Sequence, residues 1–467
     1  MVKVAGIPRR SVAVLLGGLL LVASQAAVGV AAAAGTRGPT QPAAALPRHL
    51  VPGSWPGPSP LVRDPRLRAL APSRADTNVP QPGVGGELHG VFCTSPANCW
   101  AVGFYVPARG QETELNEVLH WNGSAWSAVS VPNPAGTASG DVNQLFAVRC
   151  TASSNCWAVG NVGNPGNPAV ALQALHWNGR TWSLVRTPQP AGVAAFGISG
   201  LFDVACRSAS NCWAVGDYMK GSTELNLAVH WNGRTWSLVR TPQPAGTAAH
   251  DANALSAVRC ISASTCLAVG SVGVLTSPFG SRNEVLRWNG RRWSPVLVPS
   301  PAGDPRTGGL SELFGLSCVS ATSCWAVGDY GHFLTQPTFF SQALHWNGRR
   351  WSLVAVPEPG GTAGGANQAL VGIACSSPAN CWAVGGYVPS GGDTLATLNL
   401  AVHWNGRAWS LVTTPDPGGF DVNGFNELVA VRCTSAINCW AVGEAGSLTT
   451  SLVGEALHWD GGIWSAG

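Results

Sequence analysis

Acidic side chains recur at two fixed positions of a repeated pattern, although charged residues make up only 11% of this 467-residue chain. One position directly follows an Ala-Val-Gly segment, and four of its copies are Asn161, Asp217, Asp329 and Glu444. The other begins an apolar segment, where four copies are Glu87, Gln144, Glu312 and Glu427. Just beyond the first position stand all four tyrosines, Tyr105, Tyr218, Tyr330 and Tyr387.

Converging carboxylates can bind a cation or act as a general acid and base. Acids beside aromatic rings also suit a polyhydroxylated or cationic ligand.

Asp203 is a further acidic candidate, because its equivalents in the other repeats are Gly or Ala. The candidate ligand-binding residues are therefore Glu87, Gln144, Asp203, Asp217, Tyr218, Glu312, Asp329, Tyr330, Tyr387, Glu427 and Glu444. The alternative is a solvated rim of ordinary acids, and no residue is assigned a catalytic role.

Fourteen cysteines form seven pairs with five residues between partners, and the first members of successive pairs are 54 to 58 residues apart. The pairs are Cys93 with Cys99, Cys150 with Cys156, Cys206 with Cys212, Cys260 with Cys266, Cys318 with Cys324, Cys375 with Cys381, and Cys433 with Cys439. Zinc or redox chemistry would need ligands that converge, whereas each pair here belongs to its own short hairpin. The spacing predicts one disulfide in each repeat, which contributes roughly 2 kcal/mol in the chain-entropy description. No free thiol is expected.

Histidine and tryptophan also occupy fixed positions. His120, His176, His230, His345, His403 and His458 each fall on a third strand, too far from a common axis to share an ion, so we expect structural or surface roles. The repeats account for 20 of the 21 Trp residues, which we expect to fill the spaces between neighbouring units, with sugar stacking as the alternative. Arginines after the Asn-Gly turns are expected to diverge around a rim: Arg180, Arg234, Arg291, Arg349 and Arg407.

Each repeat contains four short strand signals and no helical period. In the third repeat they are residues 201–206, 212–216, 227–231 and 235–239, with a tight Asn-Gly hairpin between the last two. Seven such units predict an all-β protein, a seven-bladed β-propeller of four-stranded antiparallel blades with one disulfide per blade. A β-solenoid and a string of small separate domains are the alternatives.

The Trp-Asn-Gly-x-x-Trp hairpin resembles the Asp-box turn of sialidase-type propellers, with Asn in place of Asp in six repeats. The second-strand glycine followed by an aromatic pair, as in Gly103-Phe104-Tyr105, resembles kelch repeats. The resemblance covers residues 87–467. It implies a propeller but no particular activity, because both families include enzymes and binding proteins.

The alternating strand direction predicts two different faces of the disc. The disulfide hairpins and the Asn-Gly turns should share one face and vary little. The loops from the second to the third strand, and those between blades, should share the other face and vary strongly, as ligand sites do. A Pro-x-Pro element follows six of the repeats, and the seventh copy, Pro80 with Pro82, precedes the first. We therefore expect the N-terminal segment to close the ring.

Residues 1–34 resemble a secretory signal peptide, with an uncleaved anchor as the alternative, and residues 35–75 form a Pro-rich linker before the propeller at 76–467. A formal net charge of +4 does not favour nucleic-acid binding. We expect a secreted or cell-surface monomer that binds a glycan or protein, with no cofactor, no metal and no membrane span after cleavage. The alternatives are a glycan hydrolase or lyase that uses the acidic mouth, and a purely structural matrix protein.

Overall fold

The computed structural model describes residues 79–109, 112–164, 167–193, 199–276, 279–332, 338–362, 365–389, 396–447, 449 and 451–467. The predicted leader (1–34) and linker (35–75) lie outside these residues. Among the described residues, no helix is long and apolar enough to cross a membrane.

Each repeat folds into an antiparallel sheet of four consecutive strands. The innermost strands are β1 (Gly85–Ser95), β5 (Val142–Ala152), β9 (Ser199–Ser208), β13 (Asp251–Ser262), β17 (Gly309–Ser320), β21 (Asn367–Ser377) and β25 (Gly424–Ser435). The second strands are β2 (Asn98–Val106), β6 (Asn155–Asn164), β10 (Asn211–Lys220), β14 (Thr265–Val274), β18 (Ser323–His332), β22 (Asn380–Val388) and β26 (Asn438–Ser447). The third strands are β3 (Leu115–Trp121), β7 (Asn167–Trp177), β11 (Thr223–Trp231), β15 (Gly280–Trp288), β19 (Thr338–Trp346), β23 (Leu398–Trp404) and β27 (Ser451–Trp459). The outer strands are β4 (Trp126–Ala128), β8 (Trp182–Val185), β12 (Trp236–Leu238), β16 (Trp293–Pro295), β20 (Trp351–Val354), β24 (Trp409–Leu411) and β28 (Trp464–Ala466). A short 3₁₀ helix, η3 (Pro305–Thr307), precedes β17.

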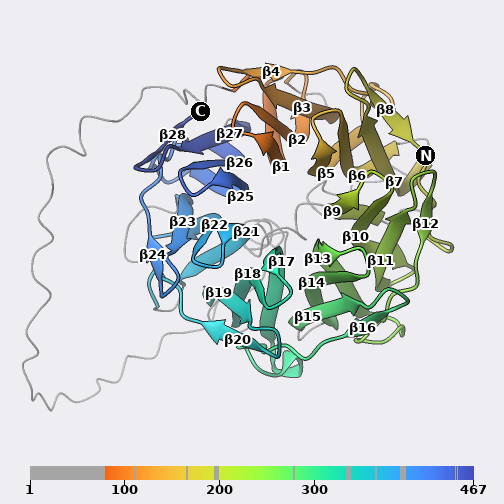
Figure 1. Ribbon diagram of the computed structural model, residues 1–467, viewed down its shortest axis with the longest axis vertical. Helices are drawn as coiled ribbons and strands as arrows, with labels where there is room; N and C mark the ends of the chain where they lie inside the picture. Colours follow the sequence, from red (N-terminus) through yellow and green to blue (C-terminus); the bar gives the residue numbers. More distant parts are fainter. Residues whose placement is uncertain are drawn as a thin grey trace, which may run out of the picture.

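The seven sheets stand around a common axis and form a closed ring in which β25 lies beside β1 (Figure 1). The predicted all-β, seven-bladed propeller is therefore confirmed.

Every blade carries one disulfide between its two inner strands. Cys93 stands directly opposite Cys99 in the ladder of β1 and β2, with their Cα atoms 4.0 Å apart. The other six bridges occupy the same place in their blades and join Cys150 to Cys156, Cys206 to Cys212, Cys260 to Cys266, Cys318 to Cys324, Cys375 to Cys381, and Cys433 to Cys439. All seven predicted pairings are confirmed, and none of the described cysteines is free.

Tryptophans fill the spaces between blades, as predicted. Trp157 on β6 is 1% exposed, and its ring centroid lies 4.7 Å from that of Trp231 and 5.1 Å from that of Trp236 in the next blade. His176 of the same blade packs on Trp157 and places Nε2 2.7 Å from Asn155 Oδ1. This histidine position therefore has the structural role that the sequence predicted.

The Asn-Gly hairpin differs from the expected two-residue turn. Trp121 pairs with Trp126, so four residues form the loop, and Gly123 has φ +98° whereas Asn122 is not in a left-handed conformation. The Asn122 side chain instead accepts hydrogen bonds from the backbone amides of Ser124 (2.9 Å) and Ala125 (3.0 Å). Asparagine is therefore needed here for its side-chain oxygen, in an Asx-type turn.

The N-terminal segment completes the last blade. In the Pro-x-Pro element after the third blade, Gln243 donates through Nε2 to the carbonyl oxygen of Asn226 on β11 (3.1 Å). Gln81 makes the equivalent bond to the carbonyl oxygen of Gly454 on β27 (2.9 Å). Val79, 6% exposed, packs into the apolar cluster between the last and first blades. This contact, which we call the N-terminal clasp, supports the predicted ring closure.

A β-bulge recurs in every innermost strand. In the first blade, Leu88 and Gly90 pair with consecutive residues of β2, so His89 between them has no partner in the ladder. The same register shift occurs in the other six blades. A bulge re-aims a side chain and interrupts strict alternation. The seven bulged residues line a channel at the axis: His89, Phe146, Phe202, Ser256, Phe314, Val371 and Val429.

Candidate functional site

The predicted division into two faces is confirmed by contacts between turns. Trp121 Nε1 donates to the carbonyl oxygen of Pro96 (3.1 Å), which places a β3–β4 turn against a disulfide hairpin. We call this side the hairpin face. On the other side, Thr113 before β3 donates to the carbonyl oxygen of Ala138 between the first two blades (2.9 Å). We call this side, with its variable connections, the loop face.

The strand register brings several predicted site residues together at the loop-face end of the axis. Glu312 stands opposite Asp329, and Glu427 stands opposite Glu444. Gln144 likewise faces Asn161 across the β5–β6 ladder. The acidic and amide side chains at this end of the inner strands form what we call the mouth.

Most of the mouth residues are buried between blades. The exposed fractions are 1% for Asp217, 2% for Asp329, 4% for Glu427, 5% for Glu444 and 7% for Gln144. Glu87 and Glu312 are partly exposed. These two carboxyl groups are therefore the predicted acids with a surface that a ligand in the mouth could contact.

The carboxyl groups of the mouth hold their protons to unusually high pH. Burial, then the charge of Glu114, raises the pKa of Glu87 to about 7. Burial, then the charge of Glu87, raises the pKa of Glu427 to about 7. Burial also raises the pKa of Glu444 well above its ordinary value, and Glu444 donates a hydrogen bond to Glu87. Near neutral pH these groups are therefore a mixture of hydrogen-bond donors and acceptors.

A further set of polar residues, on the third strands, was not identified from the sequence. Gln173 on β7 donates through Nε2 to the carbonyl oxygens of Gln144 (2.8 Å) and Asn161 (2.7 Å), which joins three strands. It also bonds to Asn116 of the preceding blade. The equivalent residues are Glu117, Glu284, Gln342 and Glu455. A sequence signal for this set was available: in five repeats a Glu or a Gln stands three residues before the repeated His or Arg.

The predicted tyrosines are not brought together. Tyr218 packs against the cluster between the second and third blades, and Tyr387 against the cluster between the fifth and sixth. Tyr330 packs on Phe340, with ring centroids 5.5 Å apart. Burial raises the pKa of all three phenols, so they are neutral hydrogen-bonding groups. All three are partly exposed and occupy separate places around the disc.

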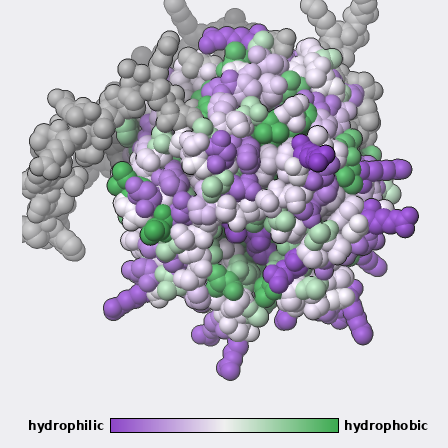
Figure 2. Space-filling model, turned by 45° about the horizontal axis from the view of Figure 1, so that its top comes forward, coloured by the Kyte–Doolittle hydropathy of each residue, from purple (hydrophilic) through white to green (hydrophobic). Residues whose placement is uncertain are grey.

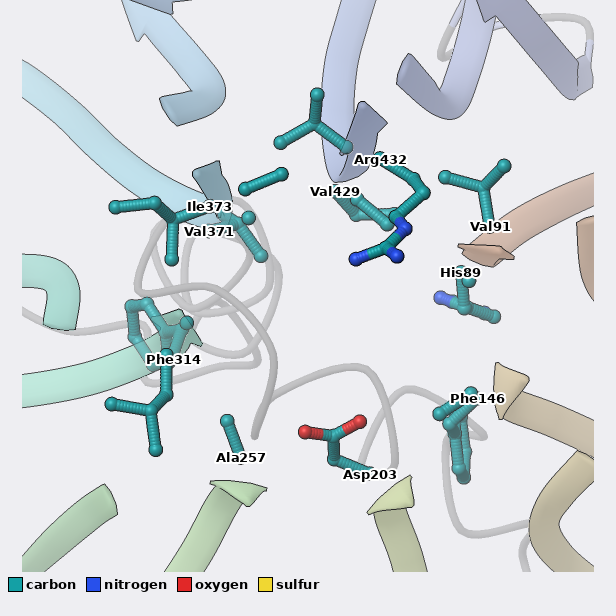
Figure 3. A pocket seen from close by; sticks show the side chains of 18 of the residues that line it. His89, Val91, Phe146, Asp203, Ala257, Phe314, Val371, Ile373, Val429 and Arg432 are labelled. Carbon is teal, nitrogen blue, oxygen red and sulfur yellow. The ribbon is translucent and has the colours of Figure 1, made fainter. Parts of the chain in front are cut away.

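Asp203 lies apart from the mouth, in the axial channel. Its carboxylate accepts a hydrogen bond from the backbone amide of Val258 (2.8 Å) and forms an ion pair with Arg259 of the next blade. Figure 3 shows Asp203 and Arg432 directed into the same cavity, which has a volume of about 120 Å³. Three arginines that were not identified from the sequence also line this cavity: Arg149, Arg259 and Arg432.

His89 lies on the channel wall beside Glu87 of the mouth. Its Nε2 lies 3.4 Å from Glu87 Oε2, and its ring packs against Phe104 and Phe146. Burial lowers the pKa of His89 to about 4, so the imidazole is neutral. Among the described residues, no group of three or more His, Cys, Asp or Glu side chains is arranged to hold a metal ion.

No family model matches the sequence, and no curated protein matches it. Among solved structures, an ulvan lyase of polysaccharide lyase family PL25 matches with a TM-score of 0.51 and 10% identity, over 83% of this chain and 94% of that chain. The lectin of Aleuria aurantia matches with a TM-score of 0.38 and 13% identity, over 67% of this chain and 91% of the lectin. A GH74 xyloglucanase from Xanthomonas campestris matches with a TM-score of 0.45 and 13% identity. The match covers 80% of this chain, which spans about half (54%) of the length of the enzyme. At these identities the likeness shows the fold alone.

Proposed function

We propose that the protein is an exported propeller that binds a glycan through the loop face, without a catalytic step. The observation that carries this proposal is the composition of the mouth. Glu87 and Glu312 are partly exposed there, and burial raises the pKa of each carboxyl above its ordinary value. With a pKa of about 7, the Glu87 carboxyl both donates and accepts hydrogen bonds near neutral pH, as the hydroxyl groups of a sugar require.

Burial of the other acids favours binding over catalysis. A glycosidase needs two carboxyl groups that flank the scissile bond. Asp217, Asp329, Glu427 and Glu444 are at most 5% exposed. Asp203, the one acid that lines the channel cavity among the described residues, is paired with Arg259.

The exposed surface supports a polar ligand. In Figure 2 the face in view carries hydrophilic side chains around its perimeter, and its apolar residues are scattered. Large exposed apolar residues include Leu184, Leu238, Leu353 and Leu411, one on each of four outer strands. Seven disulfides also support export, because such bonds persist in oxidising compartments.

The test is a glycan array probed with the whole secreted chain, followed by titration of each glycan that binds. Glu87→Ala combined with Glu312→Ala should weaken binding about tenfold, since each lost polar contact contributes about 0.5–1.5 kcal/mol. The matched control is Arg234→Ala with Arg349→Ala, two exposed turn residues of the hairpin face. If the control abolishes binding while the mouth variant binds normally, the loop face is the wrong surface. A pull-down that captures a protein, with no glycan bound on the array, would contradict the glycan assignment.

The second candidate function is a glycan hydrolase or lyase. The observation in its favour is the hydrogen-bonded pair of Glu87 and Glu444, in which both carboxyl groups have raised pKa values. Pairs of carboxyl groups with shifted pKa values are a common acid–base arrangement. Each glycan that binds should therefore be incubated with the protein and assayed for new reducing ends and unsaturated products. Product that disappears in Glu87→Gln would establish the enzyme instead of the binding module.

A further inference from the structure

Three arginines converge at the hairpin-face end of the channel. Arg149, Arg259 and Arg432 each directly precede the first cysteine of a blade, on β5, β13 and β25. Because the inner strands are equivalent in the ring, the three residues stand at one level of the axis. All three line the same cavity of about 120 Å³.

The positive charge of this level is only partly balanced. Asp203 is the one acid that lines the cavity among the described residues, and it is bound to Arg259. Three cations and one anion leave a formal charge of 3 − 1 = +2. The Nε atoms of Arg149 and Arg432 are buried and have no hydrogen-bond partner among the described residues. Burying a charged donor without an acceptor costs free energy. A ligand that accepts hydrogen bonds from these two Nε atoms would remove that cost.

Two of the guanidinium groups are held in place by one aromatic ring. The guanidinium carbons of Arg149 and Arg432 lie 4.5 Å and 4.4 Å from the ring centroid of Phe92. Phe92 belongs to the first blade, and the arginines come from the blades on either side of it. Burial first, and then the neighbouring arginines, lower the pKa of Arg149 to about 9. The fold thus packs two like charges against one ring, and an anion bound beside them would offset their repulsion.

The site is open to the hairpin face and lies within a positive region. A groove beside Phe92 and Arg432 is lined by hydroxyl and amide groups of the first two blades: Thr94, Ser95, Asn98, Thr151 and Ser153. Arg207 is exposed on the same face, and its charge acts on Arg149. Further out, the β3–β4-type turns carry exposed arginines: Arg180, Arg234, Arg291, Arg292, Arg349, Arg350 and Arg407. Positive groups around a cleft attract anions and speed their association.

We propose that Arg149 and Arg432, with Arg259 beside them, form a binding site for a tetrahedral dianion, sulfate or phosphate, at the hairpin-face end of the channel. Such a dianion balances the formal charge of +2 left by the three arginines and Asp203. Its oxygens accept the unpaired guanidinium hydrogens. The cavity equals the liquid volume of about four waters, which is enough for one small oxyanion. The ion can come free from solution or as an ester group on a glycan. The site is independent of the glycan surface proposed for the loop face.

The test is isothermal titration of the whole chain with sodium sulfate and sodium phosphate against sodium chloride at matched ionic strength. We expect one sulfate or phosphate per chain and a rise in melting temperature. Arg149→Gln with Arg432→Gln should weaken binding at least tenfold, since a hydrogen bond to a charged group is worth about 1.5–3 kcal/mol. Arg234→Gln with Arg349→Gln should bind as the parent does. Without anion, the first variant should melt no lower than the parent, because it relieves repulsion.

A second arm separates the two sources of the dianion. A heparin-derived octasaccharide and its desulfated form are titrated into the parent chain, with and without free sulfate. Binding of the sulfated form that free sulfate displaces indicates an ester group as the ligand. Binding of free sulfate alone indicates a free ion. The proposal is overturned if neither the free ions nor the sulfated octasaccharide bind better than chloride. It is also overturned if the variant with both Arg149 and Arg432 replaced binds them as the parent does.

Discussion

Replacing Glu284 with Gln should stabilise the propeller at neutral pH. Glu284 on β15 is 4% exposed, and its two carboxyl oxygens lie 2.9 Å and 3.0 Å from Asn226 Nδ2 of the preceding blade. In the equivalent position of the next blade, Gln342 accepts from Asn283 Nδ2 (2.8 Å) and donates to the carbonyl oxygen of Glu312 (2.8 Å). A glutamate can make the same donation only when it is protonated. Burial accordingly raises the pKa of Glu284 to about 8.

The size of the effect follows from the two pKa values. A carboxyl with pKa 4.5 in the unfolded chain and about 8 in the fold contributes its full stability below about pH 4.5 and loses it as the pH rises through about 8. At pH 7 the loss is about 3 kcal/mol, and at pH 5 it is below about 1 kcal/mol. Glu284→Gln removes this loss. For a domain of this size, 3 kcal/mol corresponds to a rise of about 4 °C in melting temperature.

The assay is scanning calorimetry of parent and variant between pH 5 and pH 8. The difference in melting temperature should be small at pH 5 and should grow towards pH 8. The reverse variant, Gln342→Glu, should acquire the pH dependence that Glu284→Gln loses. A difference that does not change with pH, or a Glu284→Gln variant that melts below the parent at pH 8, would refute the argument that the fold keeps this carboxyl protonated.

Non-reducing peptide mapping should find each cysteine linked to the partner six positions away, and links between blades would contradict the assignment. Removing one bridge, by Cys206→Ala with Cys212→Ala, should lower the free energy of unfolding by about 2 kcal/mol in chemical denaturation. Deleting residues 76–83 should lower the melting temperature by several degrees, because it removes Val79 and the bond from Gln81 to Gly454. An unchanged midpoint would show that the clasp does not hold the ring closed.

The features that could be predicted from the sequence are those that repeat. Cys93 and Cys99 recur with the same spacing in every blade, so one hairpin explains all seven disulfides. The tryptophan packing followed in the same way. Leu267, at the one position where the repeat lacks its Trp, still packs with Trp351 of the next blade. Local spacing was sufficient because each of these contacts has at least five other copies in the chain with which to compare it.

Burial of the mouth acids, and of the third-strand acids beside them, could not be predicted, because it depends on contacts between blades. Glu455 on β27 is fully buried, and its carboxyl oxygen accepts from Asn399 Nδ2 of the preceding blade (3.3 Å), a partner 56 residues away. The arginines of the channel were missed for a different reason. Strict alternation from Leu145 would place Arg149 on the buried side of β5. The bulge at Phe146 shifts the register, so Val148 and Cys150 join Leu145 in the core instead.

The N-terminal clasp has a mechanical consequence. Six of the seven junctions between neighbouring blades are crossed by a covalent chain, whereas the junction of the last and first blades is crossed by packing and by bonds such as that from Gln81 to Gly454. Tension that enters the disc at Val79 while a bound partner holds its surface would therefore load this seam first. The disulfides lie within blades and cannot carry that load across the seam. Under force the ring should open there, while each blade keeps its own four strands.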